Sequence, residues 1–467
     1  MTCKRAVGPL DKRNRMSRCQ ACAARKIRCS GGVPCDYCVK TTQTCHEQKK
    51  KKPRAAVFIY QAQTPTTNQT VSAAKGTTRS PRPKQIPEGP DSRFLDYCMA
   101  LLDCNRFVHN HLALTAELLP LLRTSSLLAS AVRAVGALSA SRRGSICLNR
   151  GRNSASLIAF SAYAASITEL QMALMDRNVA ERGDVLWGIF FLGLFELMVD
   201  PSGEGWAKHM VSGASKLLQL AGPENSMAVS RRVFFQVFRV LETTRAIIYG
   251  HHTILATPGW IGLQQGNSSQ TSSSWKRMDE ILSLMIRVSA FSARFFERIP
   301  ELASSESSTL IGDLGKEGLE IQTSIYVWHE KAILHLESEQ TVDSIIHLAL
   351  ACYHSLLVFL SNNYNYYRFW HNTAAAPRLS QEEIEQHVES IIQHAENILK
   401  ASEISSVLLL FPLRVAGTHA ESGTRTRILR LLDGVFARGF VVSSRIKEDL
   451  NEYWADKDSP FPRFDPL

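Results

Sequence analysis

Six of the 11 cysteines in this chain lie between positions 19 and 45, with the spacing C-x2-C-x6-C-x5-C-x2-C-x6-C. They are Cys19, Cys22, Cys29, Cys35, Cys38 and Cys45. The spacing is an internal repeat, because CQACAARKIRC at 19–29 and CDYCVKTTQTC at 35–45 align cysteine on cysteine. Closely spaced thiols of this kind bind metal, form disulfides or exchange them. The segment is therefore a candidate for metal or redox chemistry.

Two tetrahedral zinc ions need eight ligand contacts, and six thiolates supply eight only if two sulfurs each bridge both ions. The symmetry of the repeat indicates the first cysteine of each half, Cys19 and Cys35, as the bridges. The other ligands are then Cys22 and Cys29 for one ion, and Cys38 and Cys45 for the second ion. We therefore expect two Zn²⁺ per chain as the cofactor.

Other uses of these cysteines fit the sequence less well. A redox C-x-x-C pair belongs on a thioredoxin-like βαβ unit, whereas this segment is basic and polar and has no strand pattern. A disulfide-linked fold needs an oxidising compartment, and the N-terminal sequence lacks the apolar core of a secretory signal. A single four-cysteine zinc site stays open as an alternative, although it leaves two regularly spaced thiols unexplained.

The two halves of the repeat differ in the side chains between their cysteines. Arg25, Lys26 and Arg28 of the first half correspond to three threonines, at 41, 42 and 44, in the second half. Ligation at Cys22 would begin a short helix that carries Arg25 and Lys26 and could enter a DNA major groove. Arg and Lys donating to guanine O6 and N7 make the commonest base-specific contact, so a G-rich triplet is the expected target.

These residues resemble the fungal Zn(II)2Cys6 binuclear cluster family of transcription factors. The resemblance covers about thirty residues, every cysteine spacing falls within the family pattern, and Pro34 lies where the family commonly has a proline. In that family the first and fourth cysteines bridge the two zinc ions. The resemblance also implies that CGG-like triplets are read through the first helix, at the positions of Arg25 and Lys26.

Further basic residues surround the cysteines. Arg18, Arg28 and Lys40 flank the cluster and are candidates for phosphate contacts, which position a protein on DNA without specifying sequence. A basic run follows Cys45 directly and is typical of a nuclear import signal, extra phosphate contacts or both. The run consists of Lys49, Lys50, Lys51, Lys52 and Arg54.

Charge and composition divide the chain into a basic head and a nearly neutral body. Residues 1–54 hold 15 Lys and Arg against 3 Asp and Glu, although the whole chain has a formal net charge of only +11. Residues 61–90 are rich in Thr, Ser and Pro, which is typical of a disordered linker. We predict a Zn2Cys6 DNA-binding domain at 17–47, a basic run and disordered linker at 48–90, and an all-α regulatory domain at 91–467.

Apolar residues beyond position 91 recur mostly at helical spacing. Helices are predicted at 91–104, 125–140, 156–175, 344–360 and 382–401. Serine- and glycine-containing stretches near 265–274 and 302–316 predict loops. This body resembles the fungal-specific transcription factor regulatory domain, through FLDYCMALLD and the pairing of VLWGIFFLGLFELMV with GEGWAKHMVSGASKLLQLAGP. The resemblance implies a regulatory role and transfers no ligand residue.

The body contains no H-E-x-x-H motif, P-loop or G-x-S-x-G, so we expect no catalytic residues and no enzymatic activity. The apolar run 185–199 is too short to span a bilayer and predicts a buried helix, so no membrane partner is expected.

Trp187, Phe190, Phe191 and Phe195 in that run are predicted core residues, and adjacent His251 and His252 are predicted exposed or capping residues. Cys98, Cys104, Cys147 and Cys352 are interpreted as small buried groups. Aromatics of the acidic tail, among them Tyr453, Trp454, Phe461 and Phe464, either pack on the body or form an activation segment.

We expect a nuclear, sequence-specific DNA-binding regulator of RNA polymerase II transcription. Its expected partners are double-stranded DNA and the transcription machinery or co-regulators. Homodimerisation stays open, because the linker shows no heptad pattern. The family resemblance implies control of a metabolic or secondary-metabolite gene cluster. Two rival hypotheses are a helical enzyme that the cluster targets to chromatin, and a zinc-organised interaction module without base preference.

Overall fold

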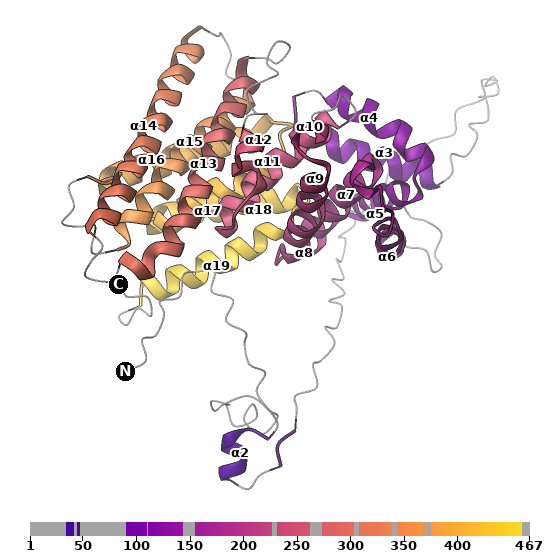
Figure 1. Cartoon of the computed structure of the whole chain (residues 1–467), viewed down its shortest axis with the longest axis horizontal. Coiled ribbons are helices and arrows are strands. Elements are labelled where there is room, and N and C mark those ends of the chain that lie inside the picture. Colours follow the sequence, from indigo (N-terminus) through magenta and orange to yellow (C-terminus); the bar gives the residue numbers. More distant parts are fainter. Residues whose placement is uncertain are drawn as a thin grey trace, which may run out of the picture. The chain divides into compact units, whose positions relative to one another are not determined.

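The computed structural model describes residues 34–41, 44–46, 90–109, 111–142, 155–226, 231–261, 273–302, 308–338, 343–367, 370 and 375–459. The chain forms two units, Met1–Pro87 and Glu88–Leu467. Within the first unit the described secondary structure is one short helix, α2 (Asp36–Lys40). The larger unit contains the other helices that the structure describes, and we refer to it as the helical body (Figure 1).

The first half of the helical body consists mostly of short and medium helices. They are α3 (Pro90–Asp103), α4 (His111–Thr124), α5 (Ser126–Arg142), α6 (Ala155–Ala173), η1 (Val179–Glu181), α7 (Gly183–Val199), α8 (Glu204–Lys208), η2 (His209–Ala214), α9 (Ser215–Ala221), α10 (Pro223–Ser226), α11 (Arg232–Tyr249), η3 (Ile254–Ala256) and α12 (Pro258–Ile261). In this group η2 is a π-helix, while η1 and η3 are 3-10 turns.

The second half contains the longest helices. They are α13 (Ser273–Leu302), α14 (Ser308–Ser338), α15 (Ser344–Asn365), α16 (Gln381–Ala401), η6 (Ser406–Leu409), α17 (Leu410–His419), α18 (Ser422–Ala437) and α19 (Val442–Lys457). The described residues contain no β-strand, and their isolated bridge joins Arg106 to Ile404 in parallel. The prediction of an all-α body is confirmed. The domain boundaries remain predictions.

All five helices predicted from apolar periodicity are present, as α3, α5, α6, α15 and α16. The loop predicted around 302–316 is wrong from Ser308 onward, because α14 begins there. Leu310, Ile311 and Leu314 pack against the core, and this apolar burial outweighs the glycine and serine content of the segment. The loop predicted near 265–274 is wrong at its end, where α13 begins and Ser274 is buried; the rest of it lies outside the described residues.

Helix α7 lies at the centre of the first half of the helical body. It is apolar on every side, so it must be covered on every side. It packs against α5, α6, α8 and η2. Trp187, Phe190, Phe191 and Phe195 are all buried, so their predicted core role is confirmed. The indole N–H of Trp187 donates to Glu117 Oε1 at 2.8 Å, which satisfies its polar atom inside the core.

The second half of the helical body is built around α15. Figure 1 shows α13, α14, α15 and α16 together at one end of the body, with α3 to α7 at the other end. By length and composition alone, α15 is long and apolar enough to cross a membrane, and so is the bent pair formed by α4 and α5 taken together. In the folded body, 78% of the apolar window of α15 is buried. Burial among neighbouring helices accounts for its apolar character, as it does for α7.

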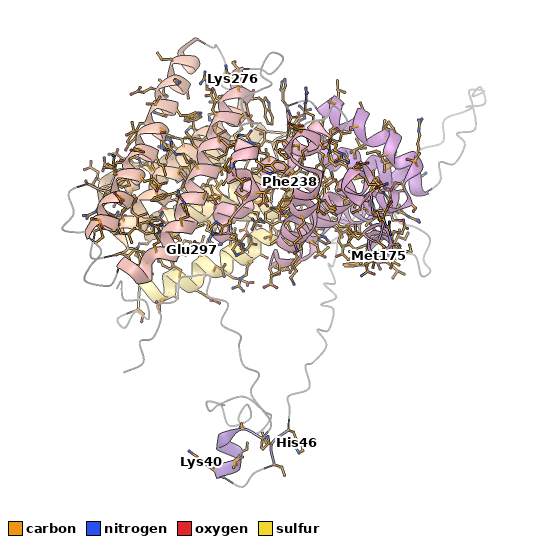
Figure 2. All side chains as sticks on the ribbon, viewed as in Figure 1. Lys40, His46, Met175, Phe238, Lys276 and Glu297 are labelled. Carbon is orange, nitrogen blue, oxygen red and sulfur yellow. The ribbon has the colours of Figure 1, made fainter. Side chains whose placement is uncertain are left out.

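The helical body buries most of its large apolar side chains but leaves some exposed: of the residues labelled in Figure 2, Phe238 is 1% exposed and Met175 is 85% exposed. Cys98 and Cys352 are buried, as predicted, and burial raises the pKa of each thiol to about 12. The prediction is wrong for Cys104, which is exposed because it lies in the turn after α3. Cys147 lies outside the described residues.

The C-terminal helix α19 packs back on the helical body. Trp454 is buried, and its indole N–H donates to the carbonyl of Gly417 at 2.8 Å. Arg425 lies over the same ring, 5.2 Å from its centroid. Tyr453 packs against the core. The packed interpretation of the tail therefore holds for these two aromatics, while Phe461 and Phe464 lie outside the described residues.

The contact between α3 and α5 gives a test of the fold. A Cβ at Gly136 would lie 1.8 Å from the carbonyl oxygen of Phe94, so the two helices would have to separate. We predict that Gly136→Ala lowers the free energy of unfolding by about 3 kcal/mol or more. The measurement is chemical denaturation of the purified protein.

The matched control is Gly312→Ala in α14, where an added Cβ meets nothing within 4 Å. This change should be neutral or stabilise the helix by up to about 1 kcal/mol. Equal effects of the two substitutions would contradict the packing of α3 on α5.

Candidate metal centre

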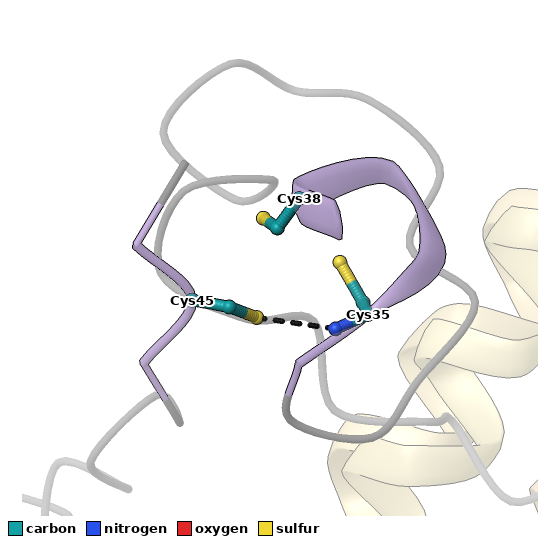
Figure 3. A group of neighbouring side chains, drawn as sticks. All are labelled: Cys35, Cys38 and Cys45. Carbon is teal, nitrogen blue, oxygen red and sulfur yellow. Dashed lines mark hydrogen bonds between the residues drawn. The ribbon is translucent and has the colours of Figure 1, made fainter. Parts of the chain in front are cut away.

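The second half of the cysteine repeat folds around α2. Cys35 lies immediately before the helix, and its carbonyl accepts a hydrogen bond from Val39 N–H at 3.0 Å. Cys38 follows three residues later within α2, which places the two side chains on one side of the turn. Figure 3 shows the side chains of Cys35, Cys38 and Cys45 gathered around one common space.

Cys45 comes from segment 44–46, which has no regular secondary structure, and completes the group. The backbone N–H of Cys35 donates to Cys45 Sγ at 3.3 Å, drawn as the dashed line in Figure 3. A hydrogen bond donated to sulfur stabilises the thiolate, which is the form that ligates metal. The arrangement therefore favours metal ligation at Cys45.

The three sulfurs fit a tetrahedral zinc ion. They lie within 4.8 Å of one another, and Cys35 and Cys38 are fully buried while Cys45 is half-buried. Zinc–sulfur bonds of about 2.3 Å place neighbouring sulfurs of a tetrahedral site about 3.8 Å apart. Small side-chain adjustments would bring the three cysteines to that spacing. They would provide three of the four ligands that a structural zinc ion requires.

The structure brings together three of the six predicted ligands. Cys19, Cys22 and Cys29 lie outside the described residues, so the bridging assignment and the count of two zinc ions remain predictions. Among the predicted DNA contacts, Lys40 is described. It is the last residue of α2 and is exposed.

The remaining predicted DNA contacts and the basic run lie outside the described residues. These are Arg18, Arg25, Lys26, Arg28, Lys49, Lys50, Lys51, Lys52 and Arg54. Their roles in base reading, phosphate binding and nuclear import are therefore still predictions.

Two groups of histidines in the helical body are of interest, and the sequence analysis identified one of them. His251 and His252 are both exposed, as predicted, and His252 Nε2 lies 2.8 Å from a carboxylate oxygen of Glu297. Sequence reasoning missed four histidines of α15 and α16 that meet between the two helices. Their regular seven-residue spacing on each helix was the available signal.

The helical body identifies the family of the chain. Residues 105–462 match the family model described as "Fungal specific transcription factor domain", and the chain belongs to this family. The matched segment begins after the cysteine segment and covers α4 to α19. Members of such a family regulate transcription, so the chain is a fungal transcription regulator.

A second comparison concerns one short segment. The chain is similar to "Thiamine repressible genes regulatory protein thi5" of Schizosaccharomyces pombe, with 47% identity over 47 residues. The similarity covers 10% of this chain and 6% of that protein, so it spans only a small part of either. No solved structure matches the chain.

Zinc content tests the cysteine group directly. Cys38→Ser removes one of the three clustered sulfurs, and we predict that the purified full-length chain then carries less zinc per chain than the wild type. Cys104→Ser is the matched control, because Cys104 is exposed and lies in the helical body. It should leave the zinc content unchanged. Elemental analysis of both variants is the measurement, and equal zinc content in the two would contradict the metal centre.

Proposed function

We propose that the chain is a sequence-specific, nuclear DNA-binding regulator of RNA polymerase II transcription. The observation that carries the proposal is the group formed by Cys35, Cys38 and Cys45 in a chain that belongs to a fungal transcription factor family. A transcription regulator must be brought to DNA, and the cysteine repeat is the part of the chain whose chemistry suits DNA binding.

The proposed reader is a Zn2Cys6 cluster that binds two zinc ions. Cys35 and Cys19 would bridge the ions, with Cys38 and Cys45 completing one ligand set and Cys22 and Cys29 the other. Zinc, when bound, would supply the positive charge that holds the thiolates together and would fix the short helices of both halves. The burial of Cys35 and Cys38 supports this role.

Base reading is assigned to the first half of the repeat. Arg25 and Lys26 would donate to guanine in a CGG-like triplet, which is the preferred partner of such side chains in the major groove. Arg18, Arg28 and Lys40 would contact phosphates and position the domain. The exposure of Lys40 on α2 supports its part in this assignment.

The basic run Lys49–Lys52 with Arg54 would direct nuclear import and add phosphate contacts. The helical body would recruit co-regulators or the transcription machinery, and homodimers would form through this body. The similarity to a protein named as a regulator of thiamine-repressible genes supports control of metabolic genes, and a secondary-metabolite gene cluster is the narrower form of that proposal.

Selection of binding sites from random DNA at a stated salt concentration tests base reading. The wild-type chain should enrich sites that contain a CGG-like triplet. Lys26→Ala should weaken binding to the enriched site by about 1–3 kcal/mol and relax the preference for one base of the triplet. Loss of one bidentate contact is the physical reason.

Lys40→Ala is the matched control, because a lost phosphate contact weakens all sequences alike and lowers the salt dependence of binding. Enrichment of no CGG-like triplet would contradict the proposal. An unchanged preference in Lys26→Ala would overturn the assignment of that residue as a base reader.

A further inference from the structure

Helices α15 and α16 face each other through four histidines that form two pairs. His347 Nδ1 lies 2.9 Å from His394 Nδ1, and His354 Nδ1 lies 2.8 Å from His387 Nδ1. The two pairs show that the helices run antiparallel, because the higher number on α15 pairs with the lower number on α16. On each helix the histidines are seven residues, or two turns, apart and so share one face. We call these four residues the histidine ladder.

The ladder is a continuous group of rings that is partly exposed to solvent. The rings of His354 and His394 stack with centroids 5.9 Å apart, which links one pair to the other. His329 of α14 lies 6.3 Å from His354 between ring centroids. All five histidines are half-buried, so they line the seam between the helices without being sealed inside it.

Two imidazole nitrogens at these distances share one proton in a hydrogen bond, or they present their lone pairs to a common cation. Metal ligation requires the neutral imidazole. Burial, with the charges of neighbouring histidines, lowers the pKa of His354 to about 2. Burial, together with the charge of neighbouring His347, lowers the pKa of His394 to about 4. The rings are therefore neutral near neutral pH and ready to act as ligands.

Each pair also has a carboxylate close by. Asp343 lies four residues before His347, and Glu383 lies four residues before His387, one helical turn away in both cases. The charge of each carboxylate acts on its histidine, opposing the effect of burial on the pKa. Both carboxylates cap their helices, so they would favour a cation through charge while keeping their own hydrogen bonds.

We propose that the histidine ladder binds two divalent transition-metal ions of the type that imidazole prefers, such as Zn²⁺ or Ni²⁺, one between each pair. In the tetrahedral geometry of Zn²⁺, metal–nitrogen bonds of about 2.0–2.1 Å place two ligand nitrogens about 3.3 Å apart, so each pair would open by roughly half an ångström. Within the described ranges no third His, Cys, Asp or Glu ligand atom joins either pair within 4.8 Å, so water completes each coordination shell.

Bound ions would link α15 to α16 and make the stability of the helical body depend on metal concentration. The site is separate from the cysteine group and needs none of its residues. It therefore gives the regulator a metal-dependent element in the helical body itself, whatever the role of the N-terminal cysteines.

Nickel uptake by the untagged, zinc-loaded full-length chain tests the ladder. The protein is dialysed to equilibrium at neutral pH against micromolar Ni²⁺, and nickel and zinc are counted by elemental analysis. The wild type should take up two nickel ions per chain and melt at a higher temperature with nickel than without it. The double variant His354→Gln/His387→Gln should bind one nickel ion, as should His347→Gln/His394→Gln.

Two controls separate the ladder from other sites. His251→Gln/His252→Gln removes an exposed histidine pair and should leave nickel uptake unchanged. Cys38→Ser should also retain the nickel, since it alters only the cysteine group. Circular dichroism shows whether each variant keeps its helices, and a wild type that takes up no nickel overturns the proposal even if a ladder variant unfolds.

The proposal is overturned if the wild type binds no nickel. It is equally overturned if a folded variant that lacks all four ladder histidines binds as much nickel as the wild type.

Discussion

The need to cover α7 on every side determines the architecture of the first half of the helical body. A helix of this length with an apolar surface all round is unstable unless neighbouring helices exclude water from it. The neighbours α5, α6, α8 and η2 do so, and α3 in turn packs closely on α5 at Gly136. The same constraint operates around α15, whose apolar window is mostly buried. Helix packing alone can therefore maintain the body.

The sequence of the N-terminal unit points to a different stabilising interaction. Its cysteine segment is basic and polar and has few apolar side chains to bury, so hydrophobic packing contributes little to its stability. Three sulfurs within 4.8 Å of one another are compatible with thiolates only if a cation compensates their mutual repulsion. We infer that metal binding and folding are coupled in this unit, whereas the helical body folds without the cysteine metals.

Local patterns in the sequence predicted much of the fold and part of the site. Apolar periodicity located α5, α15 and α16 well, and the aromatic run identified α7 as core. The start of α14 was missed because glycine and serine content signals a loop, while the burial of Leu314 that overrides this signal is a tertiary effect. The repeat indicated the grouping of Cys35 with Cys38 and Cys45. The histidine ladder could not be found in the same way, because pairing His354 with His387 requires the packing of α15 on α16.

Reversible zinc removal tests the central claim, that a metal-held DNA reader is joined to a regulatory body that folds without the cysteine metals. The full-length chain is bound to DNA that carries a CGG triplet, treated with a chelator, and then resupplied with zinc, while helical content is followed by circular dichroism. We predict that DNA binding disappears on chelation and returns with zinc, while the helical signal stays nearly constant. DNA binding that persists in the zinc-free protein would contradict the account.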